Sequence, residues 1–161
     1  MHPVKKITRD ATHQIFLIAV FLAIYNIIRV LKVSVTYDEA LTYMLYVNNR
    51  YKNIIACDPV VANDHIFNSL LAKICVNLFD QNAFFLRLPN IIAHLIYLLY
   101  GYLLLHYLFR GKRWWIFCGF LLLNLNPFLF DFWGLCRGYG LSIAFMMASL
   151  YHLLRYTYAT K

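Results

Sequence analysis

The feature that most constrains this chain is a run from Pro89 to Phe109 that contains no charged residue. About 20 consecutive apolar residues is the length of a helix that crosses a lipid bilayer. Three more stretches, at about 15–35, 114–130 and 138–154, are similarly rich in apolar residues. The pattern therefore predicts an all-α membrane protein with about four transmembrane helices, forming a single membrane domain over 1–161.

Composition supports the membrane assignment. Hydrophobic residues make up 62% of the chain and charged residues 14%, whereas a soluble domain has about 45–50% apolar and about 25% charged residues. These values exclude a disordered chain, a coiled coil and a small disulfide scaffold. The net charge of +8 would suggest a nucleic-acid partner in a soluble protein. Because the basic residues lie at the ends of apolar runs, we expect membrane lipids as partners and no nucleic acid.

The distribution of charge predicts an orientation. Basic residues cluster in the N-terminal tail, in the Arg110–Arg113 turn and in the C-terminal tail. Segment 36–86 instead carries five acidic residues against three basic ones. By the positive-inside rule, both termini and the Arg110–Arg113 turn are cytoplasmic, and loop 36–86 lies on the outer or lumenal side.

Two prolines predict where helices begin and bend. Pro89 suits the first turn of the second span, because the missing N–H of a proline costs nothing there. Pro127 lies near the end of the third span, where a proline predicts a kink or an early stop.

The outer loop is too long and too apolar to be a simple linker. Residues 38–47 have apolar positions at helical spacing, and Asn63 with Asp64 can begin a second helix that runs to Leu78. That helix has an apolar stripe of Ile66, Phe67, Leu70, Leu71, Ile74 and Leu78. Two amphipathic helices lying in the membrane interface are predicted, with helices that only cover the bundle as the alternative.

Asp38 and Glu39 are the first candidates for chemistry, because they directly follow the first span. Carboxylates at a membrane surface can bind a hard cation or act as a general base. On a helix the two side chains point about 100° apart, so they need not share a role. The alternative is that both only stabilise the N-terminus of the next helix.

Three arginines, one aspartate and one histidine complete the candidate set. Arg29, Arg87 and Arg137 lie near the predicted outer face, and a guanidinium is well suited to bind phosphate. Each could instead be an interfacial anchor, and Arg29 could also reach the interface or pair with Asp38. Asp64 and His65 could serve a ligand or form a solvated helix cap. Convergence of the arginines with the acidic loop would suit a lipid-linked phosphate.

Several motifs occur in an order that resembles a known superfamily. The first is Tyr37-Asp38-Glu39-Ala40 after the first span, and the second is the block Asn63–Leu70. The most specific is Leu78–Asn90, which contains Leu-Phe-x-x-x-x-Phe-x-Leu-Arg-Leu-Pro, and Arg137-Gly138-Tyr139 opens the last span. The series resembles the N-terminal part of GT-C integral-membrane glycosyltransferases, in the branch of protein O-mannosyltransferases and lipid A aminoarabinose transferases.

The resemblance implies an outward-facing site and a sugar donor linked to polyprenyl phosphate, with an acceptor hydroxyl. Asp38 would be the catalytic base or the ligand of a divalent cation such as Mg²⁺ or Mn²⁺, with Glu39 as its neighbour. Arg87 and Arg137 would be structural or would contact the donor phosphate, and His65 would belong to the loop site. We also expect a bacterial inner-membrane protein with a periplasmic loop 36–86.

Superfamily members usually have about twice as many spans. The sequence is therefore expected to be part of a longer or split enzyme whose remaining spans, or a companion subunit, complete the donor site. The alternative is a non-catalytic membrane subunit, or a remnant, that binds lipid or a partner protein. A small transporter is the third hypothesis, with Arg29 as its main support.

Overall fold

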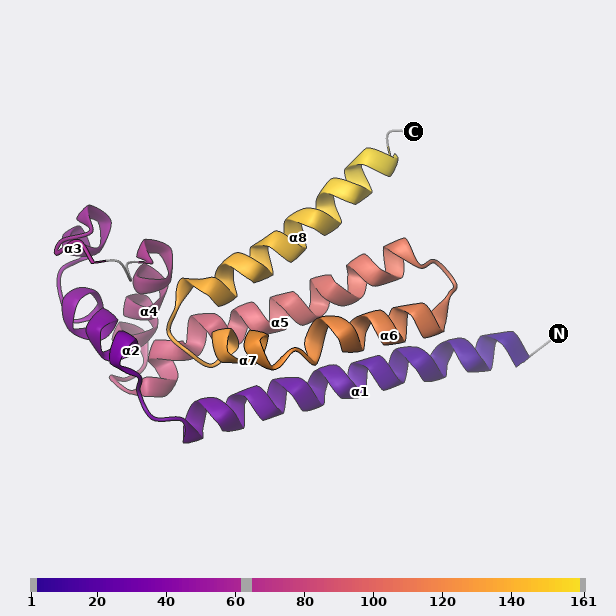
Figure 1. The fold of residues 1–161 in the computed structure, drawn as a ribbon, viewed down its shortest axis with the longest axis horizontal. Coiled ribbons are helices and arrows are strands. Elements are labelled where there is room, and N and C mark those ends of the chain that lie inside the picture. The colour runs from indigo at the N-terminus through magenta and orange to yellow at the C-terminus, as the bar shows by residue number, and fades with distance from the viewer. Residues whose placement is uncertain (1–2, 62–64, 160–161) are drawn as a thin grey trace.

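The computed structural model of the chain describes residues 3–61 and 65–159, and for residues 3–11 it describes the backbone alone. Every regular element in these ranges is a helix, as predicted. The long helices run along the bundle, and the short helices between residues 37 and 78 gather at one end of it (Figure 1). In chain order the elements are α1 (Pro3–Lys32), α2 (Tyr37–Thr42), η1 (Tyr43–Val47), α3 (Tyr51–Ala56), α4 (Ile66–Leu78), α5 (Ala83–Leu108), α6 (Arg113–Asn124), α7 (Pro127–Trp133) and α8 (Gly138–Ala159).

Fewer helices than the predicted four meet the requirements of a membrane span. The Thr12–Lys32 part of α1 and the whole of α5 are long and apolar enough to cross a bilayer. The pair α6 and α7 qualifies together but is bent by 64°, which gives up to three spans within the described ranges. The chain is thus an all-helical protein with two or three helices that could span a membrane, and α8 does not meet the same test.

The prediction that Pro89 occupies the first turn of its helix is wrong. α5 begins six residues earlier, at Ala83, and Pro89 lies inside it. The start is set by Asn82, whose side-chain oxygen accepts hydrogen bonds from the backbone N–H groups of Phe84 (3.0 Å) and Phe85 (3.1 Å). An asparagine in this position satisfies donors that the first helical turn leaves unpaired, so the helix can form ahead of the proline.

The predicted effect of Pro127 is confirmed. α6 ends at Asn124 and α7 starts at Pro127, which occupies the first turn of the new helix. The side chain of Asn126 caps α7 by accepting a hydrogen bond from the N–H of Phe128 at 3.0 Å. At the break, the hydroxyl of Tyr97 donates to the carbonyl oxygen of Leu123 at 2.9 Å, which satisfies a backbone group that the bend frees.

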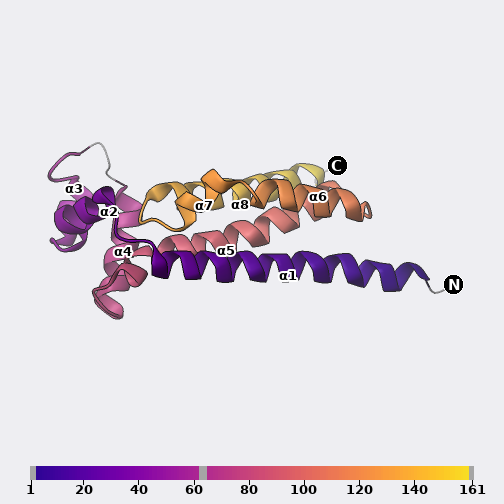
Figure 2. The same ribbon diagram turned by 60° about the horizontal axis from the view of Figure 1, so that its bottom comes forward.

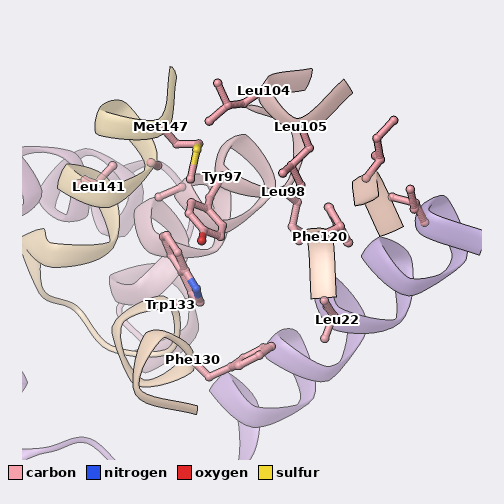
Figure 3. Close-up of a cluster of buried hydrophobic side chains, with 14 residues drawn as sticks. Leu22, Tyr97, Leu98, Leu104, Leu105, Phe120, Phe130, Trp133, Leu141 and Met147 are labelled. Atoms are coloured by element: carbon pink, nitrogen blue, oxygen red, sulfur yellow. The ribbon is translucent and has the colours of Figure 1, made fainter. Parts of the chain in front are cut away.

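Trp133 lies at the centre of the main core and is 1% exposed. Its ring stacks on that of His94, with 5.3 Å between centroids. It also lies beside the ring of Tyr97 (Figure 3), with 5.0 Å between centroids. Around it, side chains from α1, α5, α6, α7 and α8 form one apolar cluster. This packing holds the C-terminus of α7 against α5. It thereby fixes the position at which the short link from α7 to α8 begins.

The predicted outer loop is folded in its described parts, 36–61 and 65–86. Its short helices α2, α3 and α4 lie at one end of the bundle, whereas the Arg110–Arg113 turn lies at the other end (Figure 2). The predicted helix 38–47 is observed as α2, which continues as the π-helical turn η1. We call the end that carries α2–α4 the loop end and the opposite one the turn end.

The buried face of α4 carries polar side chains. Its buried residues are Asn68, Ser69 and Lys73 together with Ala72 and Val76. Of the predicted apolar stripe, Ile66, Phe67, Ile74 and Leu78 are exposed, whereas Leu70 and Leu71 are half-buried. An outward apolar face is expected for a helix whose solvent includes lipid, and its polar face is free to pack on polar groups of the bundle.

Gly140→Ala is expected to destabilise the fold. A Cβ at this position of α8 would lie 2.6 Å from Oδ1 of Asn90 and 2.9 Å from the backbone oxygen of Phe132. Because the backbone cannot retreat easily, we expect a loss of about 1–3 kcal/mol in the free energy of unfolding. Gly101→Ala is the matched control, since its Cβ would meet only Leu123, at 3.9 Å. Unfolding of both variants in detergent tests this, and equal losses would contradict it.

Candidate functional site

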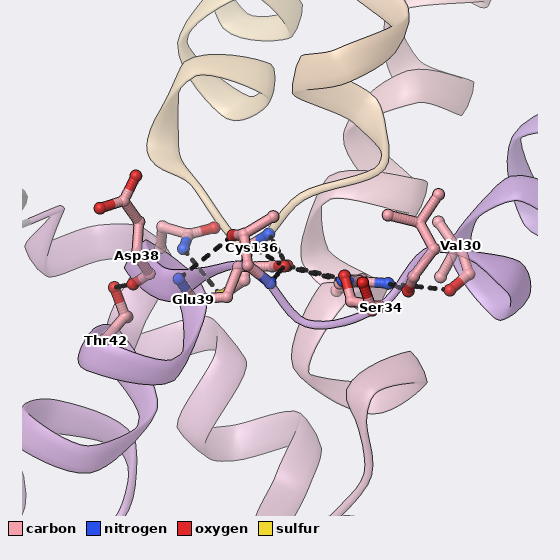
Figure 4. A network of polar contacts seen from close by, with 10 residues as sticks. Val30, Ser34, Asp38, Glu39, Thr42 and Cys136 are labelled. Atoms are coloured by element: carbon pink, nitrogen blue, oxygen red, sulfur yellow. Dashed lines mark hydrogen bonds and ion pairs between the residues drawn. The ribbon is translucent and has the colours of Figure 1, made fainter.

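The loop end is assembled around a buried ion pair between Glu39 of α2 and Arg87 of α5. Nε and Nη2 of Arg87 each donate to one carboxylate oxygen of Glu39, both at 2.7 Å. Both side chains are 0% exposed. This two-point contact is the strongest geometry available to an arginine and a carboxylate, and Figure 4 shows the network that surrounds it.

Arg87 also donates hydrogen bonds to the last turn of α1 and to the segment that follows it. Its Nη1 donates to the carbonyl oxygens of Val30 (2.9 Å) and Val33 (2.8 Å), and its Nη2 donates to that of Ser34 (3.0 Å). A guanidinium has five N–H donors, and here all five are used inside the protein. Arg87 therefore holds the C-terminus of α1, where carbonyl groups lack helical partners, against α2 and α5.

Glu39 connects two further segments. It accepts hydrogen bonds from the backbone N–H of Thr36 (3.0 Å) and from that of Cys136 (2.7 Å), in the link between α7 and α8. Thr36 and Glu39 form a capping box at the start of α2, which is one of the two roles the sequence left open for Glu39. Burial alone raises the pKa of the Glu39 carboxyl, but hydrogen bonds from Arg87, Thr36 and Cys136 outweigh it and hold the pKa below its ordinary value.

This lowered pKa predicts acid sensitivity. Because the folded-state pKa of Glu39 lies below the unfolded value of about 4.3, the stabilisation is complete above that value and is lost as the pH falls through the folded-state pKa. Glu39→Gln should unfold more readily than the unsubstituted protein at pH 7, and the difference should shrink at acid pH. Thermal unfolding of both proteins between pH 7 and 3 measures this, and parallel curves throughout would contradict the assignment.

Asp38 points away from Glu39 (Figure 4) and has a different partner. Its carboxylate forms an ion pair with the guanidinium of Arg137, the residue directly before α8. The Asp38 side chain is 33% exposed and that of Arg137 26% exposed. The structure thus brings together Asp38 and Arg137, two of the predicted site residues, and leaves both accessible.

His65, at the start of α4, packs on the two residues that follow Arg137 in the chain. Its ring contacts that of Tyr139, with 4.9 Å between centroids, and a Cβ on Gly138 would lie 2.9 Å from it. A cleft of about 210 Å³ between α4 and α8 is lined by His65, Asn68 and Ser142 among others. Nε2 of His65 and Nε of Arg137 are buried, and the described residues supply neither with a hydrogen-bond partner. Buried polar atoms are normally satisfied, so these two mark a place where the polar groups of the site are incompletely paired.

Two other predicted residues have different places. Arg29 pairs with Asp131 of α7 and not with Asp38, because the end of α1 meets α7. Asp64, predicted with Asn63 to begin the second loop helix, lies outside the described residues.

A second layer of buried polar groups was not predicted. Asn90 donates to Asn68 at 2.9 Å, and Asn68 donates to the thiol of Cys136 at 3.3 Å. These side chains link α5, α4 and the segment before Arg137. Asparagines inside apolar helices are the signal that could have identified them, since a buried amide needs partners.

The described residues fit a metal ion poorly. No group of three or more His, Cys, Asp or Glu side chains comes together in 3–61 and 65–159. If Mg²⁺ or Mn²⁺ takes part, Asp38 is the carboxylate at this site that would bind it, in competition with Arg137.

Comparison of the chain with protein-family models, with curated proteins and with solved structures finds no match. The assignment of function therefore depends on the residues of the site themselves.

Proposed function

We propose that this chain is a glycosyltransferase of the GT-C type, which transfers a sugar from a polyprenyl-phosphate-linked donor to an acceptor hydroxyl. The observation that carries the proposal is the partly exposed ion pair of Asp38 and Arg137. The cleft between α4 and α8, which His65 lines, begins at Gly138, the residue that follows Arg137. A carboxylate can act as the general base for a hydroxyl, and a guanidinium binds phosphate. The pair holds both groups that such a transfer needs.

The ion pair suggests an order of events. The donor phosphate binds Arg137 and replaces the carboxylate of Asp38 as its partner. Asp38 then accepts the proton of the acceptor hydroxyl, whose oxygen forms a bond to the anomeric carbon of the sugar. The bond between that carbon and the phosphate oxygen breaks, and the lipid phosphate leaves with its negative charge balanced by Arg137. His65 is positioned to contact the donor or the acceptor.

Arg87 and Glu39 act as positioning residues in this scheme. All N–H groups of Arg87 have partners within the protein, and both side chains are fully buried. Their role is to hold α1, α2, α5 and the link before Arg137 in one arrangement, so that Asp38 and Arg137 meet. The ion pair of Arg29 and Asp131 supports the same arrangement from the side of α1.

We also propose a membrane topology with four spans. α1, α5, the bent pair α6–α7 and α8 would be four spans of a bacterial inner-membrane protein, with both termini cytoplasmic and loop 36–86 periplasmic. The clustering of basic residues at the turn end and the outward apolar face of α4 support it. Further spans or a companion subunit would add contacts to the lipid chain of the donor, whereas the groups proposed to react with it, Asp38 and Arg137, lie in this chain.

Transfer by the purified protein tests the proposal. The protein is reconstituted in phospholipid vesicles with polyprenyl phosphates that carry a labelled hexose or aminopentose, and with lipid and peptide hydroxyl acceptors. We expect the label to move to an acceptor with release of polyprenyl phosphate. Binding of the donors without release of polyprenyl phosphate would contradict the proposal and favour a non-catalytic lipid-binding subunit.

A further inference from the structure

The break between α6 and α7 lies at the depth of the hydrocarbon core in the membrane placement proposed above. α6 begins at Arg113, at the turn end, and has 12 residues, which carry the chain about 18 Å along the helix axis. The core of a bilayer is about 30 Å thick. At the break, the carbonyl oxygen of Leu123 accepts a hydrogen bond from the hydroxyl of Tyr97, in the middle of α5. A chain that enters the membrane at the turn end therefore reaches the break before it leaves the hydrocarbon.

The backbone at the break is incompletely paired. The side chain of Asn126 caps α7 by accepting the N–H of Phe128 at 3.0 Å. Among the described residues, however, no hydrogen bond reaches the N–H of Asn126 or the carbonyl oxygens of Asn124 and Leu125. Pro127 has no N–H that could serve these carbonyl groups. The break thus presents one backbone donor and two backbone acceptors without partners.

The same backbone is exposed among apolar side chains. Residues 125–128 are all exposed. Leu122 is 81% exposed, Leu125 58% and Phe128 75%, and these large side chains disfavour a water-filled cavity around the break. Lipid tails offer no hydrogen bonds, and irregular backbone is not found exposed to lipid within the hydrocarbon region. Another protein segment is therefore the partner that can satisfy the break.

We propose that the break surface, formed by Leu122 and residues 125–128, is the docking site of a transmembrane helix from outside this chain. That helix belongs to the further spans or to the companion subunit. At the contact it carries a side chain that both donates and accepts hydrogen bonds, an amide or a hydroxyl, as is common between membrane helices. This side chain pairs with the N–H of Asn126 and the carbonyl oxygen of Leu125, and apolar neighbours pack on Leu122 and Phe128. The inference rests on the proposed membrane placement of α6 and α7, and does not depend on the transfer reaction.

Photocrosslinking to probe helices tests the proposal. The photoreactive residue p-benzoylphenylalanine replaces the exposed Leu125, and the protein is reconstituted in phospholipid vesicles with one of two synthetic helices. The first probe is a polyleucine helix of about 20 residues with one asparagine at its centre, and the second has leucine at that position. We expect the label at Leu125 to crosslink to the asparagine probe about tenfold more efficiently, which is the effect of one hydrogen bond between model membrane helices.

The same label at Ile24 of α1 is the control. Ile24 is 52% exposed and lies in a candidate span, so its label should crosslink to the two probes equally. Equal crosslinking of the probes from Leu125, or preferential crosslinking of Leu125 to a second copy of this chain, would overturn the docking proposal. If neither position crosslinked to a probe or to lipid, the membrane placement would be wrong and the docking proposal with it. No sugar donor is present in the vesicles, so each of these outcomes is distinguishable from a failure of the transferase proposal.

Discussion

Replacing Arg87 with alanine is expected to cost about 3–5 kcal/mol in the free energy of unfolding, because it leaves a buried charge without its partner. The carboxylate of Glu39 would lose both of its guanidinium contacts. The carbonyl oxygens of Val30, Val33 and Ser34 would lose their donors as well. Chemical unfolding in detergent, followed by the fluorescence of buried Trp133, measures the change.

The conservative and control variants identify the cause. Arg87→Lys keeps the charge but offers three donors in place of five, so it should recover only part of the lost stability. Arg155→Ala removes an exposed arginine of α8 and should change stability by less than about 0.5 kcal/mol. If Arg87→Ala were as stable as Arg155→Ala, the buried ion pair would not be what holds the loop end together.

Much of the helical architecture could be predicted from the sequence. The charge-free runs predict α1 and α5, because a run of about 20 apolar residues is typical of a helix that crosses a bilayer. The break before Pro127 followed from proline geometry. The start of α5 was misplaced because Pro89 is a strong local signal, and the cap at Asn82 was overlooked.

The partners of the charged residues were harder to predict. Arg29, Arg87 and Arg137 were expected to converge with the acidic loop on one site. Instead Arg87 pairs with Glu39, 48 positions away, and Arg29 pairs with Asp131, and no local pattern specifies these partners. Thr36 and Glu39 have the spacing of a capping box. This pattern predicts that the Glu39 side chain accepts a hydrogen bond from the backbone N–H of Thr36. The burial of Arg87 depends on where α1, α2 and α5 meet, which is a property of the tertiary fold.

The second large prediction concerns Asp38. Asp38→Asn keeps the shape of the side chain but removes the base, so we expect transfer to fall by about 10²–10⁴-fold, the contribution of a general base. Donor affinity should not fall, because the asparagine competes less strongly than the carboxylate for Arg137. Stability should change little, since the Asp38 side chain is 33% exposed.

The measurement that tests the central claim most directly is the rate of sugar transfer by the unsubstituted protein, Asp38→Asn and Asp58→Asn in the same vesicles. Asp58 is an exposed carboxylate of the same loop, so its variant controls for the loss of one negative charge. We expect Asp38→Asn to lose transfer while it still binds the polyprenyl-phosphate donor, and Asp58→Asn to keep both. Full transfer by Asp38→Asn would contradict the role of Asp38 as the base.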